Sequence, residues 1–175
     1  MEISESLAHD SVILFLLRRE DYGQQLIKVL ADASKQPSKI CYLCINEPYS
    51  FVRSKLIKNN IPAEKFFFID TLTKKVQSPP QADDCIFVSS PSNLTEISLA
   101  LSKSYSEKNC GATLFDSISA MLIYETSHSI IQFVHNLLTK LRITGGKAYF
   151  IAIKDDINSD LVKDLHMFVD KVIDM

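Results

Sequence analysis

The sequence predicts an α/β fold, a three-layer α/β/α sandwich around a mainly parallel sheet of about seven strands. Seven short apolar runs are continuous rather than alternating, which is typical of strands covered by helices on both faces. Helical patterns separate these runs along the whole chain, as right-handed βαβ units require. Because 175 residues with 46% hydrophobic content can bury one core, we expect a single domain over residues 1–175.

The expected strands are rich in β-branched and aromatic residues. The last strand is expected at an edge of the sheet, where we allow an antiparallel pairing. The seven segments are SVILFLL (11–17), KICYLCI (39–45), FFFI (66–69), CIFVSS (85–90), ATLFD (112–116), AYFIAI (148–153) and KVID (171–174).

Apolar stripes at helical spacing predict the helices between these strands. Pro48 suits the first turn of the second helix, and Asn93 with Glu96 has the spacing of a capping box at the start of the third. Gly145 and Gly146 end the longest stripe. The stripes cover residues 26–33, 51–57, 94–101 and 130–141.

The charge and the N-terminal composition limit the expected partners and location. A formal net charge of -2 gives no general attraction to nucleic acid or to an anionic membrane, and leaves room only for a local basic patch. No apolar run approaches the roughly 20 residues that span a bilayer, and MEISESLAHD (1–10) lacks the basic start of a signal peptide. We therefore expect a cytoplasmic protein.

The cysteines and histidines predict no metal or redox centre. Cys41 and Cys44 form a C-x-x-C, but on a strand residues three apart point to opposite faces. Since all four cysteines lie scattered in mostly apolar stretches, they are interpreted as reduced core thiols. The four histidines lack the H-x-x-x-H or E-x-x-H spacing of metal ligands. TKKVQSPPQADD (73–84) is expected to be a polar surface loop.

Four segments follow one another in the order found in a known family. KICYLCINEPYSFVRSKLIKNNI (39–61) is similar to that family's second strand, acidic turn and helix, and GATLFDSISAMLIYE (111–125) to its Walker B strand, which ends in Asp and Ser. IIQFVHNLLTKLRITGGKAYFIAI (130–153) and HMFVDKVIDM (166–175) are similar to its next helix, glycine turn and strand, and to its closing strand. In this order the segments resemble the RecA-like ATPase core of the KaiC family. The resemblance covers nearly the whole chain and implies a RecA-like fold and an archaeal source.

The chain departs from this family where nucleotide chemistry occurs. A P-loop uses glycine backbone amides, a Lys and a Ser or Thr hydroxyl, but RREDYG (18–23) follows the first strand and G-x-x-x-x-G-K-[ST] is missing. The family's paired glutamates activate the attacking water, and here Asn46 and Glu47 stand in their place. Asparagine accepts no proton at neutral pH, so only Glu47 remains as a base.

The candidate nucleotide-binding residues each have a structural alternative. The Walker B-like Asp116 could hold a metal, or it could cap the following helix. Arg18 and Arg19 could bind a phosphate, or they could pair with Glu20, Asp21 or Glu47 at the rim of the sheet. The full candidate set, under the hypothesis that nucleotide still binds, is Arg18, Arg19, Glu47, Asp116 and Ser117.

We therefore expect a non-catalytic KaiC/RecA-like domain that serves as a protein-binding or regulatory module. It would carry no catalytic residue, cofactor or metal, and would contact a protein partner or a second copy through RecA-like faces. The alternative is a nucleotide-binding protein or ATPase with an atypical phosphate site, in which Glu47 is the base and the arginines replace the missing lysine. A response-regulator receiver is a third hypothesis, disfavoured because Glu20 and Asp21 stand behind two arginines.

Overall fold

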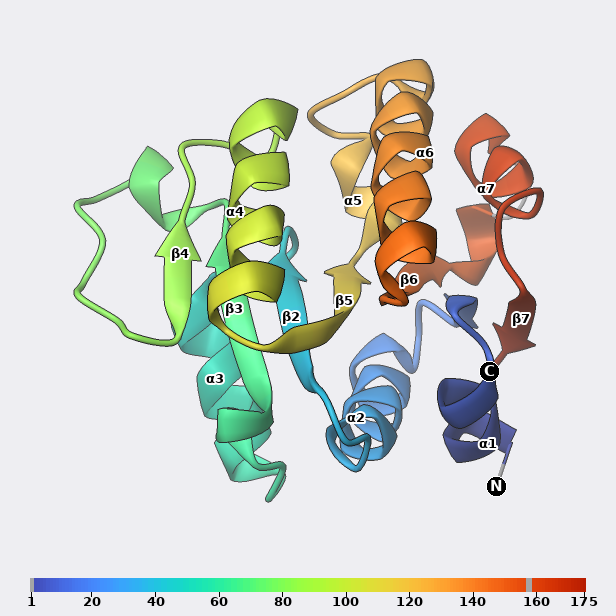
Figure 1. Ribbon diagram of the computed structural model, residues 1–175, viewed down its shortest axis with the longest axis horizontal. Helices are drawn as coiled ribbons and strands as arrows, with labels where there is room; N and C mark the ends of the chain where they lie inside the picture. Colours follow the sequence, from blue (N-terminus) through green and yellow to red (C-terminus); the bar gives the residue numbers. More distant parts are fainter. Residues whose placement is uncertain (1, 157–158) are drawn as a thin grey trace.

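The computed structural model describes residues 2–156 and 159–175, and it contains one seven-stranded sheet in the order β4-β3-β2-β5-β6-β1-β7 (Figure 1). Every neighbouring pair of strands is parallel. The antiparallel edge pairing allowed for the last strand is therefore wrong: Leu14 on β1 is in register with Val172 on β7, and both strands run in the same direction. The strands are β1 (Val12–Leu17), β2 (Lys39–Cys44), β3 (Phe66–Asp70), β4 (Cys85–Phe87), β5 (Cys110–Asp116), β6 (Lys147–Ile153) and β7 (Lys171–Asp174).

Helices cover both faces of this sheet and complete the three predicted layers. α1, α2 and α3 pack against one face, and α4, α5, α6 and α7 pack against the other (Figure 1). The helices are α1 (Glu2–His9), α2 (Tyr22–Ser34), α3 (Tyr49–Lys58), α4 (Leu94–Glu107), α5 (Ile118–Met121), α6 (Ser127–Thr144) and α7 (Asp160–Leu165). None of the helices within residues 2–156 and 159–175 combines the length and the hydrophobicity that a membrane-spanning segment requires.

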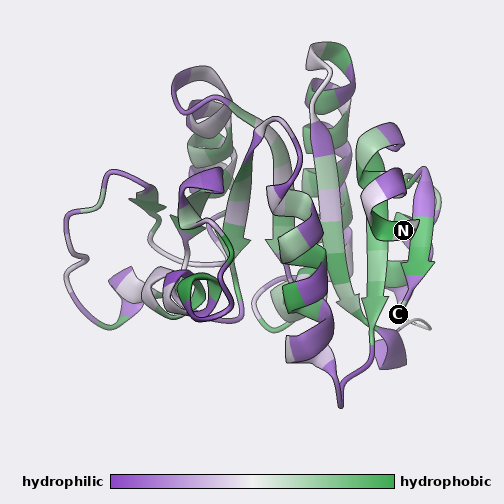
Figure 2. Ribbon diagram, turned by 90° about the horizontal axis from the view of Figure 1, so that it is seen from below, coloured by the Kyte–Doolittle hydropathy of each residue, from purple (hydrophilic) through white to green (hydrophobic). Residues whose placement is uncertain are grey.

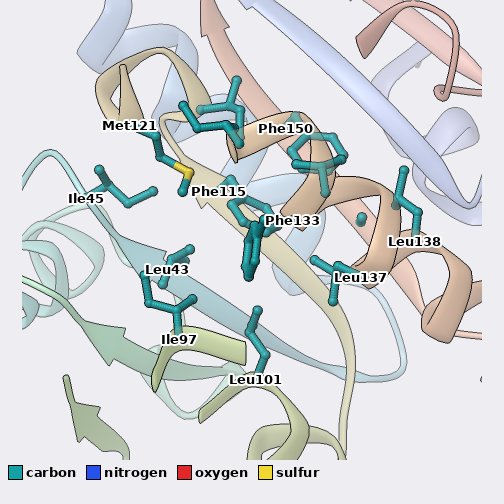
Figure 3. Close-up of a cluster of buried hydrophobic side chains, with 14 of the residues drawn as sticks. Leu43, Ile45, Ile97, Leu101, Phe115, Met121, Phe133, Leu137, Leu138 and Phe150 are labelled. Atoms are coloured by element: carbon teal, nitrogen blue, oxygen red, sulfur yellow. The ribbon is translucent and has the colours of Figure 1, made fainter. Parts of the chain in front are cut away.

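The alternation of side chains along each strand divides the core into two clusters. Leu14 and Leu16 face the cluster under α4 to α7, whereas Ile13 and Phe15 face the cluster under α1 to α3. Figure 2 shows the strands as mostly hydrophobic and the helices as mixed, with hydrophilic residues along them. The cluster under α4 to α7 is called the first cluster and the one under α1 to α3 the second. Figure 3 shows the first cluster, in which side chains from the sheet meet those of α4 and α6.

Cys41 lies in the first cluster and Cys44 in the second, so the prediction that they point to opposite faces of the sheet is confirmed. All four cysteines are buried free thiols.

The predicted helix ends are close to those observed, with informative differences. The Asn93 side chain accepts a hydrogen bond from the Glu96 N–H at 3.1 Å, but the Glu96 carboxylate accepts from the Ser89 N–H at 2.8 Å instead of completing the capping box. β4 ends at Phe87 rather than at residue 90. Gly145 ends α6 with φ +76, and Pro48 is the N-cap of α3 rather than part of its first turn.

The short helices α1, α5 and α7 were not predicted, because segments of four to eight residues carry little periodicity and depend on tertiary packing. The expected polar loop begins with a short 3-10 helix at Thr73–Lys75. No helix or strand occurs between residues 76 and 84, which the structure describes in full.

Candidate functional site

Polar residues from three strands meet at the carboxyl edge of the sheet, where parallel α/β proteins bind their ligands. β2 and β5 are neighbours, and only β6 separates β5 from β1. The turn after β1 spans residues 18–21, and α2 begins at Tyr22, so the first residue of α2 lies above this edge. Asn46 follows β2, and Asp116 ends β5.

Asp116 is the centre of this arrangement and is only 2% exposed. Its Oδ1 accepts hydrogen bonds from the Tyr22 hydroxyl and from the Asn46 amide Nδ2, the latter at 3.1 Å. Its Oδ2 accepts from the hydroxyl of Tyr42, a buried residue of β2. The Asn46 Nδ2 also lies 3.1 Å from the Tyr22 hydroxyl oxygen. Both carboxylate oxygens are therefore occupied by donors of the protein itself.

Burial decides the protonation behaviour of these groups. It raises the pKa of Asp116, because a charged carboxylate is poorly solvated in the interior, while the hydrogen bonds from Tyr22, Tyr42 and Asn46 act in the opposite direction. The pKa of each phenol is raised as well, first by burial and then by the nearby Asp116 charge. Both tyrosines therefore remain protonated and donate to Asp116.

Ser117 caps the following helix. The sequence had offered this capping role for Asp116, as the alternative to metal binding. The Ser117 Oγ accepts a hydrogen bond from the Ala120 N–H at 3.1 Å at the start of α5. It also accepts from the Asn46 Nδ2 at 3.3 Å. Ser117 is 1% exposed, so its hydroxyl is part of the same closed network.

The two arginines of the first turn point toward carboxylates at the rim. The Arg18 guanidinium pairs with Asp21 at 2.7 Å, which is one of the partners expected from the sequence. Arg19 pairs with Asp155 at 3.1 Å, a partner 136 positions away that is not among those expected from the sequence. The Arg18 N–H donates to the Gln25 side chain at 2.8 Å, so the turn is also fixed through its backbone.

Glu47 lies beside this network but forms a separate ion pair with Lys55 of α3. Of the candidate residues, the structure thus brings Asp116 and Ser117 together and leaves Glu47, Arg18 and Arg19 in ion pairs of their own. Tyr22 and Tyr42 were not singled out from the sequence as site residues. A tyrosine inside the apolar run of β2 was a usable signal, because a buried hydroxyl needs a hydrogen-bond partner.

Asp70 is a second buried carboxylate at this edge, and its contacts are structural. It accepts hydrogen bonds from the backbone N–H groups of Tyr49, Leu72 and Thr73 and from the Thr73 hydroxyl, at 2.7–2.8 Å. These bonds join the start of α3 to the end of β3. Asp70 therefore fixes α3 in place and has no free oxygen directed at a ligand.

The chemical capacity of the site follows from these contacts. A divalent metal at Asp116 would have to displace a tyrosine hydroxyl, since such ions bind through open oxygen lone pairs. Within the part of the chain that the structure describes, no group of three or more His, Cys, Asp or Glu residues could hold a metal. As it stands, the arrangement covers the Asp116 carboxylate with donors of the protein itself.

Comparisons with known proteins identify the fold alone. No protein-family model and no curated protein sequence matches the chain. Among solved structures, the KaiC-like protein PH0186 from the hyperthermophilic archaeon Pyrococcus horikoshii OT3 is similar, with a TM-score of 0.67 and 12% sequence identity. The similarity covers 94% of this chain and 72% of PH0186. The chain therefore has the KaiC/RecA-like α/β fold that its sequence predicts.

Proposed function

We propose that this chain is a non-catalytic KaiC/RecA-like domain that has lost nucleotide hydrolysis and acts as a protein-binding or regulatory module. The observation that carries the proposal is the contact between the Tyr22 hydroxyl and Asp116. In this position the family's fold would need an open carboxylate and a glycine-rich turn. Here the residue that starts α2 covers the carboxylate instead.

A magnesium nucleotide would have to displace hydrogen bonds that Asp116 accepts within the protein. Removing a hydrogen bond to a charged group costs about 1.5–3 kcal/mol, and Asp116 receives such bonds from Tyr22, Tyr42 and Asn46. The turn offers no lysine in compensation, and its two arginines are in ion pairs. The cost of displacing these hydrogen bonds and the lack of an unpaired cation in the turn both oppose binding of a triphosphate at this edge.

The wider setting of the module belongs to the same proposal. We place it in the cytoplasm, which agrees with four buried free thiols. A second copy or an active relative, bound through RecA-like faces, is the proposed type of partner. The proposed archaeal source rests on the family resemblance, which the archaeal origin of the similar structure supports.

Calorimetric titration of the protein with magnesium and a non-hydrolysable ATP analogue tests this function. We expect no binding at millimolar nucleotide, and no rise in the unfolding temperature, because only a ligand that binds the native state raises it. Tight binding that is lost in Asp116→Asn would contradict the proposal and support an atypical nucleotide site. Tyr22→Phe serves as a second variant, because it removes the covering hydroxyl and keeps the ring.

A further inference from the structure

A groove runs between α2 and α3 on the outer side of the helical layer that they form. Its volume is about 710 Å³. Ile27 and Lys28 of α2 line one wall, and Ser54, Lys55 and Lys58 of α3 line the other. The groove is separate from the Asp116 network, although its lining also includes Gly23, the residue after Tyr22.

The groove concentrates positive charge on a chain whose formal net charge is -2. Lys28 and Lys58 are exposed, and in the described part of the chain neither forms an ion pair. Lys55 is paired with Glu47. Two ammonium groups are thus available for a ligand, one from each wall, in the local basic patch that the overall composition permits.

Apolar surface accompanies these charges. Phe51 is 66% exposed and precedes Ser54, Lys55 and Lys58 by three, four and seven residues, so it lies on the same face of α3. Ile27 of the α2 wall is partly buried, and the lysine side chains contribute their aliphatic stems. Exposed aromatic residues are enriched at protein interfaces.

We propose that this groove binds an acidic segment of a partner protein that also carries an apolar side chain. The inference rests on the proposed function as a protein-binding module and identifies the surface and the chemistry of the partner. Carboxylates would pair with Lys28 and Lys58, and the apolar side chain would cover Phe51 and Ile27. The lining of each wall spans about six residues, or ~9 Å of helix, which matches about two turns of a bound helix.

The composition of the groove favours such a segment over a phosphate ligand or nucleic acid. Bidentate recognition of a phosphate typically uses arginine, and the lining contains no arginine. A carboxylate-bearing protein segment satisfies the ammonium groups and covers the apolar surface together.

Titration of the ¹⁵N-labelled full chain with a short synthetic helical peptide of Glu, Leu and Ala residues tests the proposal. At low salt, we expect amide resonances of residues 23–28 and 51–59 to shift, and the affinity to fall as salt is added. Lys28→Glu with Lys58→Glu should weaken binding by about tenfold or more, and Phe51→Ala should weaken it independently. Both lysines are exposed, so the native fold is retained and near-ultraviolet circular dichroism checks this.

The matched control is Lys103→Glu with Lys140→Glu on α4 and α6, which changes the net charge equally on the opposite face. This control should leave the affinity unchanged. The proposal is overturned if millimolar peptide shifts no resonance in the groove, if the control weakens binding as much, or if a peptide with Gln in place of Glu binds equally well. It is also overturned if inorganic phosphate or duplex DNA shifts these resonances at lower concentration than the peptide. Nucleotide binding at Asp116, measured separately, would refute the proposed function but would not affect the groove titration.

Discussion

At the scale of single residues, the two oxygens of Asp116 differ in how they are satisfied. Oδ1 accepts from both Tyr22 and Asn46, whereas Oδ2 accepts from Tyr42 alone among the described residues. The loss of one donor therefore has unequal consequences. A buried acceptor without a partner is more costly than one that keeps a second donor.

We expect Tyr42→Phe to destabilise the protein more than Tyr22→Phe. Removing the Tyr42 hydroxyl leaves Oδ2 unpaired in the interior and should lower the free energy of unfolding by about 1.5–3 kcal/mol. In Tyr22→Phe the Asn46 amide still donates to Oδ1, so the loss should be smaller. Urea denaturation of both variants measures the difference, and an equal or reversed order would show that the network is not arranged in this way.

A second prediction at this scale concerns pH. Burial raises the pKa of Asp116 in the folded state, so between its ordinary value and the raised value the folded protein binds more protons than the unfolded chain. The free energy of unfolding contributed by this group is therefore fully present at low pH and falls as pH rises through that window. Asp116→Asn lacks this titration.

The difference in unfolding free energy, wild type minus Asp116→Asn, should decrease as pH rises from about pH 4 and become constant above the folded pKa. Denaturation of both proteins across this range gives the difference, in which contributions of the other carboxyl groups cancel. A difference that increases with pH would show that the hydrogen bonds outweigh burial and lower the pKa.

At the scale of elements, two glycines near helix ends allow the effect of backbone conformation on stability to be measured separately from the effect of side-chain packing. Gly145 ends α6 in a left-handed conformation, with φ +76, and a Cβ added there would meet no atom within 4 Å. Gly23 is the second residue of α2, and a Cβ there would also be unobstructed. The two glycines therefore differ in backbone conformation but not in available space.

We expect Gly145→Ala to lower the unfolding free energy by about 1 kcal/mol, because alanine is strained at positive φ. Gly23→Ala should raise it by about 0.5–1 kcal/mol, since alanine lowers the entropy of the unfolded chain and favours the helix. Thermal and urea denaturation of the pair provide the test. Similar effects of the two substitutions would contradict the conformational explanation.

At the scale of the whole molecule, the central strand joins the sheet to α6 through aromatic contacts. The Phe115 ring of β5 lies 4.8 Å from that of Phe150 on β6 and 6.4 Å from that of Phe133 on α6, measured between centroids (Figure 3). Phe115 is fully buried in the middle of a seven-stranded sheet. Its packing therefore contributes to the cohesion of two layers.

Phe115→Ala should lower the unfolding free energy by about 3–5 kcal/mol, because it removes buried surface and leaves a cavity. Leu99→Ala on α4 is the matched control, since Leu99 is 65% exposed and its loss should change stability by no more than about 0.5 kcal/mol. Denaturant titration monitored by far-ultraviolet circular dichroism measures both. If the two substitutions lowered the unfolding free energy by comparable amounts, the aromatic contacts of Phe115 would not hold α6 to the sheet.

The sequence by itself determined the fold class, the order of the strands along the chain and the faces on which Cys41 and Cys44 lie. These features depend on local composition and on side-chain periods of 2.0 and 3.6, which can be recognised without knowledge of distant contacts. The same local signals located the caps at Asn93 and Gly145. They also placed Asp116 at the carboxyl edge of the sheet.

Only the tertiary structure decided what Asp116 contacts. Tyr22 and Tyr42 are 94 and 74 positions away from it in the sequence, and no local pattern joins them. The parallel pairing of β7, the ion pair between Arg19 and Asp155 and the groove between α2 and α3 likewise depend on how separate elements pack. Periodicity describes the surroundings of one segment, whereas the partners of a buried carboxylate are set by strands and helices that come together only in the folded chain.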